Sequence, residues 1–584
     1  MAYAITRTCC NDASCVSVCP VNCIHPTPGE PDFGSTDMLY IDPAACIDCG
    51  ACADACPVDA IFPVDRLAGP DLPYAELNRR WYEENPTDHA WGEPEFPRSL
   101  PDGFGELSVA VVGTGPSAGY TAQLLLRTTG ARVTMIDRLP VAGGLLRHGV
   151  APDHQSTKRI GESFATTFHH PALRMHLGVT IGEDLTHEDL TAYHHAVVYA
   201  VGAAGDRRLG LPGEDLPGSL PATTLVGWYN AHPAVPADAV DLRAERVVVV
   251  GNGNVAVDIA RILLTDPDEL ARTDIADHAL AALRDSRVRE VVLLARRGPE
   301  HAAWTRPEFL ALTHLAGVDV VVADDPGIRE AVAAATARAG AASVSASASD
   351  LRETAHAASE PGPDTEATAG AGSGSATGSK AALLAGLPVE PVDWAAAPPA
   401  GRRRIVLRFG VTPTELLGDA RIEGLRVAGP DGRESTIAAG LVVRSIGYRG
   451  VPVQGLPFDD ATGTIPHDGG RVVDPATGRP VPATYVVGWA KRGPSGGIGA
   501  NRDCAQETVH ALLDDAGAGL LATPAHRIQD FAGLVRLRRP NALGLRQWRA
   551  LDRAERARGE AVGRPRVKLA TVPELLASAR RFRR

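Results

Sequence analysis

The most reactive residues of the sequence are cysteines, and nine of the ten lie within the first 56 residues. Four of them read Cys46-x-x-Cys49-x-x-Cys52-x-x-x-Cys56-Pro57. Thiolates at this spacing hold iron–sulfur clusters, with the three close cysteines on one cluster and the cysteine before proline on another. Zinc sites favour two separated cysteine pairs, and disulfide scaffolds favour an even cysteine count. We therefore expect one-electron chemistry in this segment.

An imperfect second copy of this pattern lies upstream, with Cys9 and Cys10 followed by Cys15 and Cys19-Pro20. If the two copies exchange their last ligands, each cluster takes thiolates from both copies. One [4Fe–4S] cluster is then held by Cys19, Cys46, Cys49 and Cys52. The other is held by Cys56, Cys15 and Cys9, with Cys10 as the alternative to Cys9. The second spacing resembles that of seven-iron ferredoxins, so this cluster is expected to be [3Fe–4S] or [4Fe–4S]. Cys23 is expected to be a buried thiol that binds no iron.

A dinucleotide-binding pattern begins after the apolar run at 107–112. The run Gly-Thr-Gly-Pro-Ser-Ala starts at Gly113 and opens an expected helix, and a second apolar strand at 132–136 ends on Asp137. Gly113 suits the tight turn, and Gly115 lets the backbone approach a pyrophosphate at the helix N-terminus. Asp137 can accept hydrogen bonds from a ribose. Strand, glycines, helix and acidic residue together predict a dinucleotide site.

A second pattern of this kind follows the apolar run at 247–250. It reads Gly-Asn-Gly-Asn-Val-Ala from Gly251, and the next expected strand at 291–294 is followed by Arg296 and Arg297. Guanidinium groups bind a 2′-phosphate in bidentate fashion, whereas an acid would repel it. This site is therefore expected to prefer NADP(H), and the acidic first site is expected to hold FAD.

Strand and helix patterns alternate through both units, which predicts a multidomain chain with a small α+β iron–sulfur domain followed by an α/β flavoprotein with two Rossmann-like parallel sheets. In chain order, the expected domains are an iron–sulfur domain at 1–66, a proline-rich connector at 67–105, an FAD domain at 106–205 and 443–520, an NADP domain at 206–442 with a disordered Ala/Ser/Gly-rich insertion at about 338–380, and a basic C-terminal extension at 521–584.

Composition excludes several function classes. No apolar run reaches the roughly 18 residues of a membrane span, and the first residues show no secretory pattern, so a reducing cytoplasm is expected. The net charge of −12 conceals an asymmetry, because residues 1–66 are acidic and residues 525–584 carry sixteen basic against five acidic side chains. In this tail Arg553, Arg556 and Arg558 alternate with acidic residues, which is typical of a solvated helix. We expect no nucleic-acid or membrane partner.

These patterns together resemble a ferredoxin fused to a ferredoxin–NADP reductase of the adrenodoxin-reductase type. The resemblance spans 107–515 apart from the insertion. It is carried by the two glycine runs and by Gly149-Val-Ala-Pro-Asp-His154, Tyr199-Ala-Val-Gly-Ala203, Leu211-Pro-Gly-Glu-Asp-Leu-Pro-Gly218, Val226-Gly-Trp-Tyr-Asn-Ala-His232, Arg296-Arg-Gly-Pro299 and Val443-Arg-Ser-Ile-Gly-Tyr-Arg449. The sequence departs from the family at Asp137, where glutamate is usual, and at Gly144, where tryptophan often lies.

The resemblance implies cofactor contacts beyond the glycine runs. For FAD these are Ser117, Asp137, Leu145, Ile181, Trp489, Gly496, Gly497 and Ile498, beside Gly113 and Gly115. For NADP they are Arg207, Asn252, Gly253, Asn254, Val255, Arg296, Arg297, Glu308 and Gly496. His154 and Asp258 lie where the family places polar groups near the cofactor, and a hydrogen-bonding role is favoured over proton transfer for both.

Electron counting then predicts the function. NADPH donates a hydride, whereas an iron–sulfur cluster takes one electron, so FAD must stand between them. The expected acceptor is an external one-electron carrier or enzyme, such as a ferredoxin or a cytochrome P450. The alternative is an electron-input subunit of a larger enzyme such as glutamate synthase. A flavin disulfide reductase needs a cysteine pair, and beyond residue 56 the sequence has only Cys504. A non-enzymatic nucleotide sensor would not let NADPH bleach the flavin.

Overall fold

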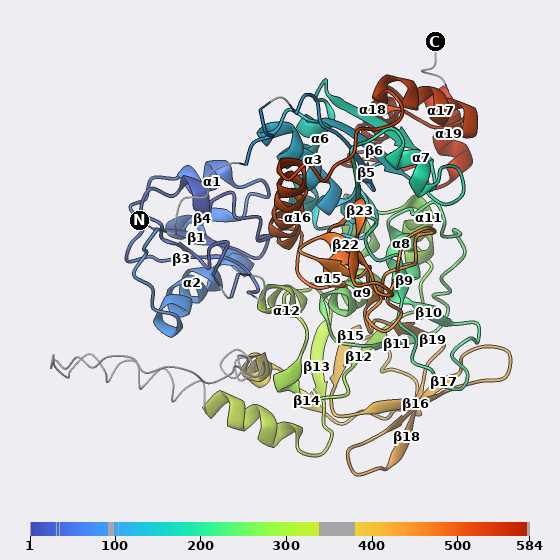
Figure 1. Ribbon diagram of the computed structural model, residues 1–584. Coiled ribbons are helices and arrows are strands. Elements are labelled where there is room, and N and C mark those ends of the chain that lie inside the picture. Colours follow the sequence, from blue (N-terminus) through green and yellow to red (C-terminus); the bar gives the residue numbers. More distant parts are fainter. Residues whose placement is uncertain are drawn as a thin grey trace.

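The computed structural model describes residues 2–30, 32–33, 36–91, 98–102, 104–337 and 380–580. The chain forms a small N-terminal lobe beside two larger α/β lobes. The N-terminal lobe is shown in blue at the left of Figure 1. The expected insertion at about 338–380 lies outside the described residues, apart from Lys380. In the described part, no helix is both long enough and apolar enough to cross a membrane.

The N-terminal lobe, residues 2–91, is built from two short antiparallel strand pairs. Strand β1 (Tyr3–Ile5) pairs with β4 (Ile61–Pro63), and β2 (Ile24–His25) pairs with β3 (Tyr40–Ile41). Helix α1 (Ala51–Ala55) follows the first two cysteines of the regular run and contains the third, Cys52. This is the small α+β arrangement expected for the iron–sulfur domain.

The segment expected as a connector contains a helix, α2 (Pro73–Glu84), that packs on this lobe. The buried Asn78 side chain accepts the N–H groups of Ile5 at 3.1 Å and Ile41 at 2.8 Å, and it donates to the Ile5 carbonyl oxygen at 2.9 Å. Pro73 is compatible with the helix because it stands in the first turn, where its missing N–H would have no partner. The helix therefore completes the lobe instead of only spacing it.

The first α/β lobe is built on a seven-stranded sheet in the order β21-β22-β23-β8-β5-β6-β7. Strands β23, β8, β5, β6 and β7 are parallel, and β5 is buried along its whole length. Its strands are β5 (Ser108–Val112), β6 (Arg132–Asp137), β7 (Leu173–Leu177), β8 (Ala196–Tyr199), β21 (His467–Asp468), β22 (Arg471–Asp474) and β23 (Arg479–Val486). Its helices include α3 (Pro116–Thr128), α4 (Leu145–His148), α5 (Gln155–Lys158), α6 (Ile160–Phe168), α7 (His187–Thr191), α15 (Trp489–Arg492) and α16 (Ala500–Gly517).

The second α/β lobe is built on a parallel sheet in the order β10-β19-β11-β12-β15-β13-β14. Its strands are β10 (Ser219–Pro221), β11 (Arg246–Val250), β12 (Glu290–Leu294), β13 (Asp319–Ala323), β14 (Val389–Glu390), β15 (Arg404–Arg408) and β19 (Leu441–Arg444). Its helices include α8 (Ala222–Tyr229), α9 (Asn254–Leu264), α10 (Pro267–Leu270), α11 (Asp277–Arg284) and α12 (Arg306–Thr313). Strands β16 (Thr412–Leu417), β17 (Gly424–Ala428) and β18 (Glu434–Ala438) form an antiparallel sheet below it in Figure 1. The two parallel sheets confirm the expected fold class.

The C-terminal segment folds as α17 (Phe531–Arg538), α18 (Leu545–Glu560) and α19 (Val572–Arg580). The expectation of a solvated helix is wrong for one face of α18, because Glu555 is 1% exposed and pairs with Arg147 at 2.6 Å. Farther along, Lys568 is buried and pairs with Asp274 at 2.9 Å. The alternation of charges hid this contact, since partners in distant segments leave no local sequence pattern.

Candidate functional site

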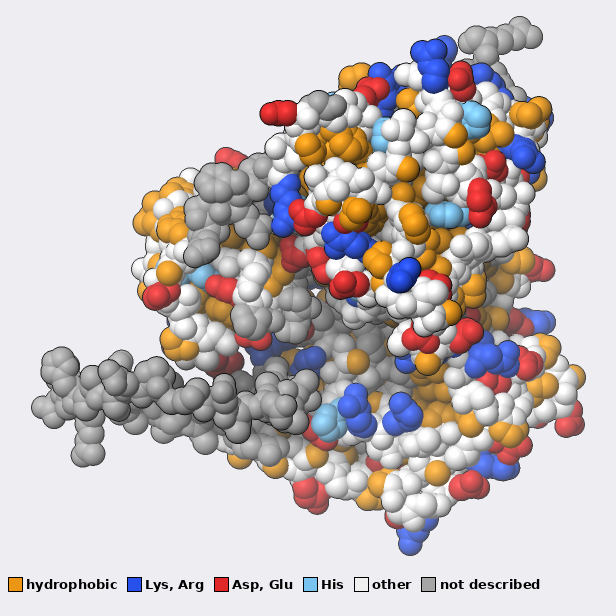
Figure 2. Space-filling model, in the orientation of Figure 1, with side chains coloured by type: hydrophobic (Ala, Val, Ile, Leu, Met, Phe, Trp, Pro, Cys, Tyr) orange, Lys and Arg blue, Asp and Glu red, His pale blue; other side chains and the backbone are white. Residues whose placement is uncertain are grey.

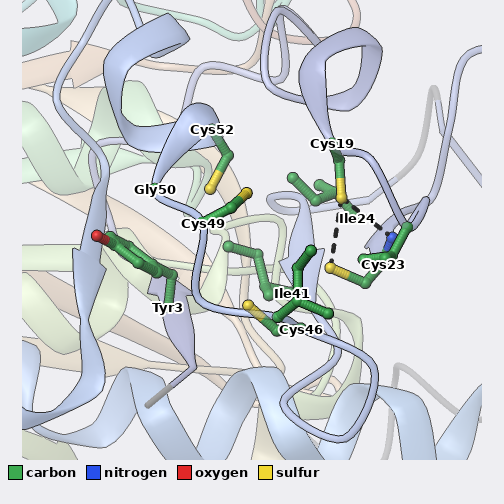
Figure 3. Close-up of a pocket in the computed structure, with 11 residues that line it drawn as sticks. Tyr3, Cys19, Cys23, Ile24, Ile41, Cys46, Cys49, Gly50 and Cys52 are labelled. Atoms are coloured by element: carbon green, nitrogen blue, oxygen red, sulfur yellow. Dashed lines mark hydrogen bonds between the residues drawn. The ribbon is translucent and has the colours of Figure 1, made fainter.

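Four thiols predicted to share one cluster line one pocket of the N-terminal lobe. Cys19 comes from the first copy of the motif, and Cys46, Cys49 and Cys52 come from the second, and all four line the pocket drawn in Figure 3. Cys49 is exposed, so this pocket opens toward solvent. Cys23 lies in the same pocket, with its sulfur 3.5 Å from that of Cys19. The sequence-based pairing of copies is therefore reproduced in space, with Cys23 as a fifth thiol beside it.

The remaining four thiols of the lobe form a second group. Burial raises the pKa of Cys15, and the negative charges of Cys9 and Cys56 raise it further. Burial and the same two charges also raise the pKa of Cys10. Burial raises the pKa of Cys9 to about 12. Cys9 and Cys10 therefore both lie within electrostatic reach of Cys56.

This donor set fits iron–sulfur clusters. All ten cysteines are free thiols, and buried thiols that repel one another's negative charge favour a bound cation that neutralises them. Backbone N–H groups also point at sulfur: Cys23 donates to the Cys19 sulfur at 3.4 Å, and Ala60 donates to the Cys56 sulfur at 3.2 Å. Such hydrogen bonds to ligand sulfurs are among the features that tune cluster potentials.

The N-terminal lobe is seated on the glycine-rich loop that precedes α16. The Gly499 N–H donates to the Cys10 carbonyl oxygen at 2.9 Å, and Arg502 of α16 donates to the Asp12 carbonyl oxygen at 2.7 Å. A side chain at Gly499 would collide with the Asn11 carbonyl group. Figure 1 shows the blue lobe lying against α16. The second thiol group is thus joined by backbone contact to the loop containing Gly496, Gly497 and Ile498.

The first glycine run has the geometry that a dinucleotide fold needs. Gly113 ends β5 with φ of +118°, and a Cβ there would collide with the Ala200 carbonyl oxygen. The chain also passes close to itself at the expected pyrophosphate position, because a Cβ on Gly144 would lie 2.8 Å from the Gly115 Cα. A tryptophan at Gly144, usual in the family, would therefore require this backbone to shift.

Asp137 lies at the end of β6, as expected, and its carboxylate accepts hydrogen bonds from the glycine turn and from the segment that follows β6. Thr114 Oγ1 donates to Asp137 Oδ2 at 2.5 Å, and the Leu139 N–H donates to Oδ1 at 2.9 Å. Burial raises the pKa of Asp137 in spite of these hydrogen bonds. The carboxylate is positioned beside the glycine turn, where the adenosine ribose of a dinucleotide lies in this fold.

The other residues expected at the first site come from four segments. Ser117 in α3 donates to Asn501 Oδ1 in α16 at 2.7 Å, which joins the first glycine run to the glycine-rich loop. Trp489 lies 5.2 Å from Tyr448, ring centre to ring centre, and its indole N–H donates to the Ser495 carbonyl oxygen at 3.2 Å. Leu145 opens α4, and Ile181 forms an isolated bridge with Leu185, and both are partly exposed.

The second glycine run repeats this geometry in the second lobe. Gly251 ends β11 with φ of +123°, and a Cβ there would collide with the Ser445 carbonyl oxygen. Gly253 precedes α9, which starts at Asn254, and Asn252 and Val255 are partly exposed beside it. The first turn of α9 is therefore sufficiently exposed to bind a phosphate.

The basic residues expected at the second dinucleotide site are exposed. Arg296 and Arg297 follow β12, and Arg207 follows β9 (Gly205–Asp206). None of the three guanidinium groups makes an ion pair within the described residues. They are available to an anionic ligand from solvent.

Three polar side chains meet where the two α/β lobes adjoin. Atoms of His154, Asp258 and Glu308 that can bind a metal or a proton lie within 4.8 Å of one another. Arg261 donates to Asp258 Oδ1 at 2.6 Å and to His154 Nε2 at 3.0 Å, and it also pairs with Asp153. Burial raises the pKa of Asp258 to about 7, with Glu308 adding to the effect and His154 opposing it.

Comparison with known proteins places this geometry in a family. Residues 107–297 match the family model described as pyridine nucleotide-disulphide oxidoreductase, and residues 39–62 match the 4Fe-4S binding domain. A probable ferredoxin/ferredoxin–NADP reductase of Mycobacterium tuberculosis is 47% identical over 99% of this chain and 95% of the relative. The chain belongs to the fused ferredoxin/ferredoxin–NADP reductases.

Two relatives that align with only part of this chain support the assignment of its reductase part. The human mitochondrial NADPH:adrenodoxin oxidoreductase is 37% identical over 80% of this chain and 91% of the relative. The solved structure of M. tuberculosis FprA in complex with NADPH superimposes with a TM-score of 0.69 at 40% identity, covering 81% of this chain and 99% of that one. The resemblance inferred from the sequence is confirmed.

Sequence reasoning missed several residues of this ferredoxin–NADP reductase site. Asn501 joins Ser117 to the glycine-rich loop, Arg261 holds His154 and Asp258 together, and Thr114 holds Asp137. Thr114 stands inside the first glycine run, so its position was a usable signal. Asn501 and Arg261 lie in ordinary helices and carry no local signal of their role.

Proposed function

We propose that the chain is an NADPH-dependent oxidoreductase that passes electrons from NADPH through FAD to iron–sulfur clusters in its own N-terminal lobe, and then to an external one-electron carrier. The relatives named above support this activity. Bound FAD supplies a group that accepts a hydride as two electrons and releases them singly, and bound clusters carry one electron at a time.

One observation supports the order of these parts more than any other. The loop from Gly496 to Gly499, expected at the flavin, makes backbone contact with Cys10 and Asn11 beside the second thiol group. The loop expected at the flavin and the segment that carries the nearer thiols are therefore in direct backbone contact. A fused lobe held in this way needs no diffusional encounter to receive electrons.

For the clusters, we assign Cys19, Cys46, Cys49 and Cys52 to one [4Fe–4S] site. We assign Cys56, Cys15 and Cys9 to the second site, with Cys10 as the alternative, because both cysteines lie in electrostatic reach of Cys56. Four available thiols would suit [4Fe–4S], and three would suit [3Fe–4S]. Cys23 is a further thiol beside the first site.

For the dinucleotides, the two lobes take different roles. We assign FAD to the first lobe, with Gly113 and Gly115 at the pyrophosphate, Asp137 at the ribose, and Ser117, Leu145, Ile181, Trp489 and residues 496–498 around the rest of the molecule. We assign NADP(H) to the second lobe, with residues 252–255 at the pyrophosphate, Arg207, Arg296 and Arg297 at the 2′-phosphate, and Glu308 and Gly496 near the nicotinamide.

The polar cluster of His154, Asp258 and Glu308 has a binding role in this proposal. Hydride transfer itself requires no acid or base from the protein. Arg261 compensates the negative charge of Asp258 and holds the His154 ring at a fixed position. The cluster therefore orients polar groups of the bound coenzyme at the junction of the lobes.

The external carrier is expected to be a ferredoxin, and a cytochrome P450 is a second acceptor class. The acidic N-terminal lobe favours a partner with a basic surface. Several red acidic side chains lie on its visible face in Figure 2. A reducing cytoplasm suits a chain with ten free thiols.

Replacing Cys49 by serine tests the path through the N-terminal lobe. Cys49→Ser should lose iron and should reduce cytochrome c with NADPH at a small fraction of the wild-type rate. Reduction of ferricyanide, which can take electrons from the flavin directly, should persist. Ala44→Ser, an exposed position in the same lobe, serves as the matched control. Wild-type cytochrome c reduction by a Cys49→Ser protein that has lost iron would contradict the proposal.

A further inference from the structure

The N-terminal lobe reaches the second α/β lobe as well as the first. Asp37 Oδ2 accepts the backbone N–H of Arg306, the first residue of α12, at 2.9 Å, although the two residues are 269 positions apart. The preceding N–H, of Thr305, donates to Asn254 Oδ1 at 2.7 Å, and Asn254 Nδ2 donates to Thr305 Oγ1 at 3.3 Å. Two consecutive N–H groups at the start of α12 are thus held from opposite sides.

The first turn of α12 carries Glu308, whose Oε2 lies 4.0 Å from His154 Nε2. The following residue, Phe309, is buried and stacks on Trp304 with ring centres 5.0 Å apart. The helix is therefore anchored in the core on one side and tied to the N-terminal lobe on the other. The position of the Glu308 carboxylate depends on both attachments.

Charges around this contact show how closely the lobes meet. Burial raises the pKa of Tyr40, the charge of Asp37 raises it further, and the charge of Arg306 opposes it, so both charges lie beside the same phenol. Burial likewise raises the pKa of Tyr74 in α2, and Glu308 is among the charges that add to it. In Figure 1, α12 lies at the lower right edge of the blue lobe.

A carboxylate at this position has two physical effects. It satisfies a helix N–H group that has no partner within the helix, and it stabilises the positive end of the helix dipole. Loss of Asp37 would free the first turn of α12 without removing any side chain of the second lobe.

We propose that Asp37 of the N-terminal lobe is a positioning residue for NADP(H) binding, because it fixes the first turn of α12 and with it Glu308. This inference rests on the proposed function, which puts Asn254 and Glu308 at the coenzyme. Coenzyme binding and the seating of the N-terminal lobe are then energetically coupled, so that each favours the other.

The test compares Asp37→Ala and Asp37→Asn in the full holoprotein. Asp37→Ala should raise the Kd of NADP⁺, measured by calorimetry, and the KM of NADPH with ferricyanide by about fivefold, which is the scale of one charged helix-end hydrogen bond. Turnover at saturating NADPH should stay unchanged. Asp37→Asn should show a smaller effect, since its amide oxygen still accepts. Hydrogen exchange at the Arg306 amide should accelerate in the same order.

Asp65→Asn is the matched control, because Asp65 is an exposed acid of the same lobe without a hydrogen bond or ion pair in the described part of the chain. It should leave all three readouts at wild-type values. Unchanged NADP⁺ affinity and Arg306 exchange in Asp37→Ala would overturn the inference, even if cytochrome c reduction fell, because Asp37 would then only seat the lobe. Failure of the wild-type protein to bind NADP⁺ would instead overturn the proposed function.

Discussion

Arg296 and Arg297 are the residues that decide coenzyme choice in this scheme. They follow β12 at the position where the first lobe has Asp137, and both side chains are exposed. A guanidinium group binds a phosphate through two parallel hydrogen bonds, whereas NADH offers only a ribose hydroxyl there. In the proposed function, the pair would therefore discriminate between coenzymes without contributing to the chemical step.

Replacing both arginines by alanine should weaken NADPH far more than NADH. Charged hydrogen bonds are worth about 1.5–3 kcal/mol each, so kcat/KM for NADPH should fall by about 30-fold or more while the value for NADH changes little. Arg287→Ala, at an exposed arginine in the preceding loop, should change neither value. Equal losses for both coenzymes in steady-state kinetics would exclude a 2′-phosphate site here.

Residues with a distinctive type and spacing could be predicted from the sequence, and residues that act through distant contacts could not. The cysteines and the arginine pair belong to the first kind, because their residue types and spacing form recognisable local patterns. Arg261, Asn501 and Asp37 belong to the second kind. Asp37 contacts Arg306, which is 269 positions away in the sequence, and no local sequence pattern indicates such a contact.

The glycine turns after β5 and β11 are the elements on which both dinucleotide sites depend. Each turn has a glycine with positive φ whose missing side chain leaves room for a carbonyl group of the neighbouring strand connection. The element pattern of strand, glycine turn and helix was predictable because each glycine run directly follows an apolar run and precedes a helical pattern. Helix α2 was not, because the prolines of residues 67–105 predicted a connector.

Alanine at each turn should affect one cofactor selectively. Gly113→Ala should leave the purified chain with little FAD, whereas Gly251→Ala should retain FAD and bind NADP⁺ weakly. Gly130→Ala separates collision from backbone strain, because Gly130 also has positive φ (+63°) but a Cβ there meets nothing within 4 Å. FAD per chain by absorbance and NADP⁺ affinity by calorimetry would measure these effects. Full FAD content in Gly113→Ala would refute the assignment of the first lobe.

At the scale of the whole molecule, the N-terminal lobe and the C-terminal segment each contact both α/β lobes. The N-terminal lobe contacts the loop at Gly499 and helix α12, and the C-terminal segment contacts Arg147 of the first lobe and Asp274 of the second. Asp274 also pairs with Lys158 at 2.6 Å. Burial disfavours the charged form of Asp274, but Lys568 and Lys158 outweigh it and hold its pKa below the usual value.

Lys568→Met should destabilise the protein through this buried cluster. Removing one partner of a buried ion pair costs about 3–5 kcal/mol, so the thermal midpoint should fall by about 3 °C. Arg558→Met, an exposed position in α18, should leave the midpoint unchanged. Adding Asp274→Asn to the Lys568→Met protein should lower the thermal midpoint by less than Asp274→Asn does in the wild-type protein, because the two residues interact. Strictly additive losses by calorimetry would show that the pair is not coupled.

The central claim is that electrons from NADPH enter the chain's own N-terminal lobe. The most direct measurement is anaerobic mixing of the full chain with one equivalent of NADPH, followed together by flavin absorbance near about 450 nm and by EPR of the clusters. We predict bleaching of the flavin band, followed by its partial return as the cluster signals change. A flavin that stays bleached while the cluster signals remain as they were before mixing would contradict the claim.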